Sequence, residues 1–184
     1  MTAPSPGSGG SRVSEQDLEA VTDQLGRPVR SVRDIAHRCS CTHPDVVRTE
    51  PQLPDGTPFP TLYYLTCPRA TSAIGTLEAE GVMKQMAARL AEEPELAASY
   101  AAAHESYLAE REELGHVEHI VGISAGGMPD RVKCLHVLVA HSLAAGPGVN
   151  PLGDQALAIL AERGVTPGSA WGGSAAGCVR QDES

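Results

Sequence analysis

The chain has 184 residues, a formal net charge of −9 and a sequence pI of about 5.2. This length fits a single domain of ordinary size with tails. The negative charge repels the phosphate backbone of nucleic acids, and no strongly basic patch offsets it, so we expect no nucleic-acid partner. No apolar run reaches the ~20 residues that a membrane span needs, and the N-terminus lacks the apolar segment of a secretory signal, so we expect a cytoplasmic protein without a membrane span.

Composition at the two ends predicts the domain boundaries. Residues 1–13 and 163–184 are rich in Pro, Gly and Ser, which predicts disordered tails around one domain at 14–162. The domain should begin with a short amphipathic helix, because Ser14 can cap it and Gly26 can end it. The stretch 27–39 is ambiguous between strand and helix.

The remaining elements predict an α+β fold, a mostly helical single domain with a small β-hairpin or sheet. Residues 45–51 and 59–68 carry β-branched and aromatic side chains around a segment dense in turn formers, which indicates two neighbouring strands. Residues 71–114 predict a helical hairpin, with Gly81 as a weak point in its first helix and Pro94 starting the second. A Gly-rich loop should then lead to a helix at 131–146 capped by Asp130, and a last helix should begin near Asp154.

Thiols and imidazoles lie near the ends of three separate predicted elements. Disulfides are uncommon in the cytoplasm, so cysteines there are more often metal ligands or reactive thiols. Zinc needs four donors, and an iron-sulfur cluster needs three or four thiolates. The pattern predicts a zinc or iron-sulfur site held by Cys39, Cys67, Cys134 and a histidine, either His136 or His141.

Helix geometry restricts which of these residues share an ion. At about 100° per residue, Cys134 and His141 face the same way on a regular helix, whereas Cys134 and His136 face opposite sides and cannot both bind one ion. The alternative is that Cys67 and Cys134 are small buried hydrophobic residues. Either histidine could equally be an interior residue bonded to a backbone carbonyl. We expect His104, His116 and His119 at the surface.

A Gly-rich turn before a helix N-terminus can also bind an anion, because its N–H groups are unpaired and the helix dipole favours negative charge. Arg131 and Lys133 would add positive charge there, as would Arg38 from the first segment, so a small anionic molecule is a candidate ligand. The alternative is a plain loop with a helix cap. Separately, Cys39 lies beside the potentially cationic His37 and Arg38, which would activate its thiol in a thiol-dependent enzyme.

Four stretches together resemble the DUF501 family, which is widespread in actinobacteria: "HRC" at 37–39, "DGTPFPTLYYLTCP" at 55–68, "GGMPDRVKCLH" at 126–136 and "GPGVNPLGD" at 146–154. The resemblance spans about residues 18–160. It implies that the family pattern includes the five predicted ligands, whereas Cys41 and His43 depart from it. The genes of this family often neighbour those of a septum-formation initiator and an exopolyphosphatase, which implies a link to cell division or polyphosphate metabolism.

Three hypotheses follow from the sequence. The leading one is a protein that binds a metal ion or an iron-sulfur cluster, with an adjacent site for a small anion. The second is a metal-free adaptor that uses the helices of 71–114 to contact a division-associated or polyphosphate-related protein. The third is a thiol-dependent enzyme that uses Cys39. The sequence leaves open whether the protein is an enzyme.

Overall fold

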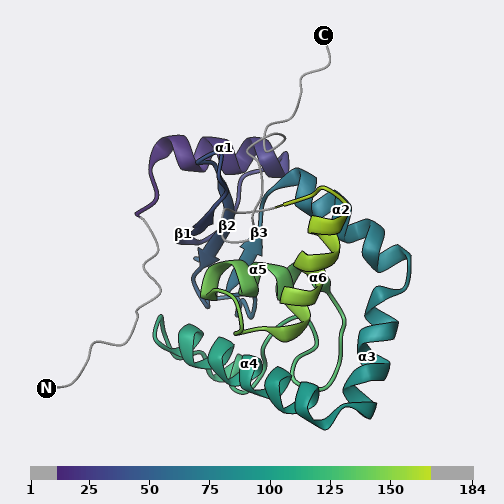
Figure 1. Cartoon of the computed structure of the whole chain (residues 1–184). Coiled ribbons are helices and arrows are strands. Elements are labelled where there is room, and N and C mark those ends of the chain that lie inside the picture. The colour runs from purple at the N-terminus through teal and green to yellow at the C-terminus, as the bar shows by residue number, and fades with distance from the viewer. Residues whose placement is uncertain (1–11, 167–184) are drawn as a thin grey trace, which may run out of the picture.

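A computed structural model describes residues 12–166 and shows a small sheet covered by helices on both faces (Figure 1). The predicted tails at 1–13 and 163–184 lie almost entirely outside these residues. The strands are β1 (Val32–Arg38), β2 (Pro44–Thr49) and β3 (Tyr63–Leu65). The helices are α1 (Glu15–Leu25), α2 (Pro68–Ala79), α3 (Val82–Glu92), α4 (Pro94–Glu112), the 3-10 turn η1 (Glu118–Ile120), α5 (Leu135–Ala145) and α6 (Pro151–Glu162).

The sheet is antiparallel, in the order β1-β2-β3. Val46 pairs with Leu65 and Val47 pairs with Tyr64. Because successive side chains of a strand point to opposite faces, the first pair faces one side of the sheet and the second pair faces the other. The expected pairing of 45–51 with 59–68 is confirmed, and the ambiguous stretch supplies β1.

Helix α1 covers one face of the sheet. Its first turn carries the predicted Ser14 cap, which forms a capping box with Asp17, and Gly26 ends the helix with a left-handed φ of 68°. Val21 of this helix packs against Ile35 and Val47 in a small apolar cluster. The prediction for this helix is confirmed at both ends.

The opposite face carries the main core, where α5 packs against all three strands and α6 packs against α5. Gly153 allows this helix pair to approach closely, because a Cβ at this position would lie 2.2 Å from the Leu138 carbonyl oxygen. Helices α2, α3 and α4 curve around this pair in Figure 1. The mostly helical α+β architecture is therefore as expected.

Three helix boundaries differ from the predicted ones. Gly81 has a φ of 86°, so it divides the first predicted helix of 71–114 into α2 and α3. Helix α6 begins at Pro151, three residues before Asp154, because Asn150 caps it by accepting a bond from the Gly153 N–H. Helix α5 begins at Leu135, four residues later than predicted.

The late start of α5 has a local cause. The preceding loop folds back on itself, with Lys133 donating its N–H to the Gly126 carbonyl and Arg131 donating to that of Gly127. A helix that began at 131 would leave these N–H groups without partners in its first turn, whereas the loop pairs both of them. No helix of the described residues is long and apolar enough to cross a membrane.

Candidate metal site

Glu78, Cys134 and His136, which we call the metal triad, bring three potential ligand atoms within 4.8 Å of one another. Cys134 precedes the first turn of α5 and has an extended backbone, with φ −156° and ψ 112°. The argument that Cys134 and His136 face opposite sides therefore does not apply, since it assumed that both lie within a regular helix. The Cys134 Sγ is 3.8 Å from the His136 Nδ1.

Helix α2 supplies the third member of the triad and fixes the orientation of the imidazole. Glu78 Oε1 accepts a 2.7 Å bond from the Leu135 N–H and lies 3.2 Å from the His136 Nδ1. The His136 Nε2 is 3.2 Å from the carbonyl oxygen of Thr71 on the same helix. Because a carbonyl only accepts, Nε2 carries the proton, and Nδ1 faces the thiol and the carboxylate.

The metal triad is electrostatically coupled. The Cys134 sulfur, and then the Glu78 carboxylate, raise the pKa of His136 to about 9 against the opposing effect of burial. Burial raises the pKa of Cys134, but the bonds from His136 and from the Val137 N–H outweigh it and leave the pKa below its ordinary value. The helix N-terminus favours the same thiolate form. The two pKa values shift in opposite directions, as expected for a thiol and an imidazole that each stabilise the charged form of the other.

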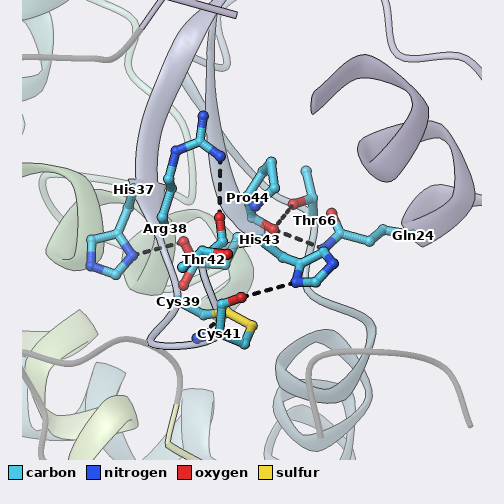
Figure 2. The surroundings of a disulfide bond; sticks show 10 residues. Gln24, His37, Arg38, Cys39, Cys41, Thr42, His43, Pro44 and Thr66 are labelled. Carbon is cyan, nitrogen blue, oxygen red and sulfur yellow. Dashed lines mark hydrogen bonds and ion pairs between the residues drawn. A yellow bond between two sulfur atoms is a disulfide. The ribbon is translucent and has the colours of Figure 1, made fainter. Parts of the chain in front are cut away.

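The structure places the other predicted thiols elsewhere. Cys39 forms a disulfide with Cys41 in the turn between β1 and β2 (Figure 2). Cys67 is 3% exposed at the N-terminus of α2, where it packs in the main core. Among the His, Cys, Asp and Glu side chains of residues 12–166, the metal triad is the group of three whose potential ligand atoms meet at ligand distance. Cys39 and Cys67 therefore do not join Cys134 there.

His141 lies in a separate buried polar cluster. It is fully buried, its Nδ1 is 3.2 Å from the Asn150 amide nitrogen, and its ring stacks on Tyr63. Its Nε2 faces Glu110 Oε1 at 3.7 Å, beyond hydrogen-bond distance. Glu110 in turn accepts a bond from the Tyr63 hydroxyl. His141 is thus an interior histidine that the structure does not bring to the metal triad.

The three basic residues predicted at an anion site lie in different settings. Arg38 makes a two-pronged ion pair with Asp17, at 2.7 and 2.8 Å. Arg131 and Lys133 are exposed on the loop before α5. At the N-terminus of that helix, the Leu135 N–H already binds the Glu78 carboxylate. A carboxylate of the chain itself therefore occupies part of the place predicted for a bound anion.

The uninvolved histidines are as expected in two of three cases. His116 and His119 are exposed. His104 was expected at the surface and is 7% exposed, with its Nδ1 2.9 Å from the Ser124 hydroxyl. The loop after α4 folds over it, an arrangement that no local pattern indicates.

Sequence reasoning missed Glu78. Its one local signal is position, because Thr71, Ile74 and Glu78 lie at spacings of three and four on one face of α2, and Ile74 is fully buried. A carboxylate on an inward-facing stripe needs a partner. The identity of that partner, 56 to 58 residues later in the chain, depends on the packing of α2 against α5.

A comparison with protein families finds a match. The family model described as "Protein of unknown function (DUF501)" matches residues 35–158. This range covers the sheet from the fourth residue of β1 onward, the metal triad and most of α6. No curated protein and no solved structure matches the chain.

Proposed function

The chain belongs to the DUF501 family, and we propose that it works as a metal-binding protein that holds one divalent ion of the zinc class through Glu78, Cys134 and His136. One observation carries this proposal: a sulfur, a nitrogen and an oxygen from α2 and the start of α5 converge within 4.8 Å. These are the three donor types that zinc accepts in proteins.

The spacing of the donors fits a tetrahedral ion. Zinc-sulfur bonds of about 2.3 Å and zinc-nitrogen and zinc-oxygen bonds of about 2.0 Å place tetrahedral S and N ligands about 3.5 Å apart, and N and O ligands about 3.3 Å apart. The corresponding distances here are 3.8 Å from Cys134 to His136 and 3.2 Å from His136 to Glu78. Small side-chain adjustments would therefore suffice to bind the ion.

The surroundings of the metal triad also support the proposal. Histidine ligands in metal sites usually donate their second N–H to a carboxylate or a carbonyl, which fixes the tautomer and the ring orientation. The bond from His136 Nε2 to the Thr71 carbonyl has this form. The Leu135 N–H holds Glu78 Oε1 in the same way.

The donor set favours a single ion over a cluster. An iron-sulfur cluster requires three or four thiolates, and this site supplies one. Three protein ligands leave a fourth position for water or another small ligand, as in catalytic zinc sites. Lys133, next to Cys134 in the chain, and Arg131 carry positive charge on the same loop, so a small anion is the ligand class that we propose for this position.

Metal titration tests the proposal. We expect metal-free protein to bind one Zn²⁺ per chain, and Co²⁺ in its place to show thiolate-to-metal absorption. Cys134→Ser should abolish this absorption, and His136→Gln should weaken Zn²⁺ binding by more than about 100-fold, since outer partners alone are worth about 10 to 100-fold. His119→Gln, which changes an exposed histidine, should bind like the wild type.

The metal-free adaptor hypothesis predicts a different outcome. The affinity for Zn²⁺ would then be the same in the Cys134→Ser variant and in the wild type. Zn²⁺ would not raise the unfolding temperature of either protein. A metal that binds only the native state must raise this temperature, by an amount that grows with the logarithm of its affinity. Equal binding by the two proteins would rule out the metal triad as the site.

A further inference from the structure

We propose that the Cys39–Cys41 disulfide is a redox-active site that exchanges with small thiols, and that the incoming thiol attacks the sulfur of Cys41. This activity is distinct from the metal site, since neither turn cysteine belongs to the metal triad. The reductant class is a low-molecular-weight thiol, two molecules of which are oxidised for each disulfide reduced.

The two cysteines differ in exposure. Cys39 is the first residue of the turn between β1 and β2 and is 5% exposed. Cys41 is half-buried and lies between the exposed residues Ser40 and Thr42. Figure 2 shows the disulfide at the tip of this turn. Thiol exchange requires the attacking sulfur to reach one sulfur of the bond directly, so access selects the sulfur that is attacked. Cys41 is therefore the electrophile.

The other sulfur is prepared to leave. The Cys41 N–H donates a 3.3 Å bond to the Cys39 Sγ. When the thiolate of the reductant bonds to Cys41 Sγ, the Cys39–Cys41 bond breaks and its electron pair goes to Cys39 Sγ, where this N–H stabilises the new charge. A second thiol then attacks the outer sulfur of the mixed disulfide and releases Cys41. Two protons from the two thiols end on Cys39 and Cys41.

The turn is held by bonds other than the disulfide, so reduction need not open it. Cys39 donates its N–H to the His43 carbonyl at 3.0 Å, and Thr42 donates to the Cys39 carbonyl at 2.9 Å. Arg38 adds a 3.2 Å bond to the Thr42 carbonyl while its guanidinium pairs with Asp17 of α1. These contacts keep the two thiols adjacent after reduction, which makes the reaction reversible.

Oxidised glutathione is the probe for the reverse reaction. We expect reduced wild-type protein to form the Cys39–Cys41 disulfide through a transient glutathione adduct on Cys41. In the single variants, Cys41 of Cys39→Ser should acquire glutathione at least about tenfold faster than Cys39 of Cys41→Ser, because Cys41 is the more exposed of the two residues. Peptide mass spectrometry assigns each adduct. Ser40→Ala, an exposed change in the same turn, should keep wild-type kinetics.

Several results would overturn the proposal: equal rates in the two variants, a wild-type adduct that never resolves to the disulfide, or a reduced wild type that stays reduced in excess oxidised glutathione. If Cys39→Ser does not fold, rapid acid quenching of the wild-type reaction still shows which cysteine first carries glutathione. Repeating the reaction on zinc-free Cys134→Ser separates this outcome from the fate of the metal site.

Discussion

Single buried polar side chains hold the irregular parts of this protein together, and Arg111 is the clearest case. It is 3% exposed, and its guanidinium donates to the carbonyl oxygens of Pro60, Ile120 and Ile123 at 3.0, 2.6 and 2.6 Å. Burial lowers the pKa of this guanidinium. One side chain at the end of α4 thus fastens the loop before β3 and the loop after η1.

Arg111→Met should destabilise the protein by about 3 kcal/mol. The substitution leaves three buried carbonyl groups without a hydrogen-bond donor, and each costs about 1 kcal/mol. Urea unfolding followed by circular dichroism measures the change. The matched control is Arg163→Met, which removes an ion pair of Arg163 with Glu80 whose side chains are 43% and 46% exposed. This variant should unfold like the wild type, because exposed ion pairs contribute little. A similar loss of stability in both variants would contradict our account of Arg111.

At the scale of elements, the contact between α5 and α6 decides where the late helices lie. The local signals for these helices were clear, but their start points and their close approach were not. Gly153 is the residue responsible, because a methyl group there would lie 2.2 Å from the Leu138 carbonyl oxygen and 2.3 Å from the Ser142 Oγ. The first of these atoms is backbone, so the helices themselves would have to separate.

Gly153→Ala should therefore cost at least about 3 kcal/mol in unfolding free energy, at the upper end of overpacking effects. Gly75→Ala is the matched control, since a methyl group at this position of α2 meets nothing within 4 Å. There the same change should stabilise the protein by about 0.5 to 1 kcal/mol, because alanine loses less backbone entropy in a helix. Thermal unfolding of the two variants should shift in opposite directions, and a shift of the same sign would refute the packing argument.

At the scale of the whole molecule, the sheet is the middle layer between α1 and the larger helical group. The predicted domain ended at residue 162, where α6 also ends, but contacts with the core continue further. Val165 packs against the main core and donates its N–H to the Leu160 carbonyl. Arg69 of α2 donates to the Gly164 carbonyl at 2.6 Å.

These contacts predict a difference between two truncated chains. A chain of residues 12–166 should unfold in one transition at the temperature of the full-length protein. A chain of residues 12–162 should unfold about 2 to 4 °C lower, because losing the Val165 packing costs about 1 kcal/mol. Differential scanning calorimetry of the three chains measures this. Identical midpoints for both truncated chains would show that residues 163–166 add nothing.

The sequence alone determined the features whose causes act within a few residues. Ser14 and Gly26 set the ends of α1, because a cap and a left-handed glycine act on adjacent N–H and carbonyl groups. The β-branched residues around Val46 and Val47 indicated a strand from an equally local signal. The sequence also named Cys134 and His136 as candidate ligands, and the structure brings them together, although a regular helix was expected there.

The tertiary structure decided which residues join them. Glu78 reaches Cys134 only because α2 packs against α5. Cys39 does not join them, because it pairs with Cys41 in the turn between β1 and β2. Cys67 and His141 lie in the core because the main helical group folds over the sheet. Contacts between residues more than 50 positions apart depend on the packing of whole elements, and a one-dimensional pattern does not contain that information.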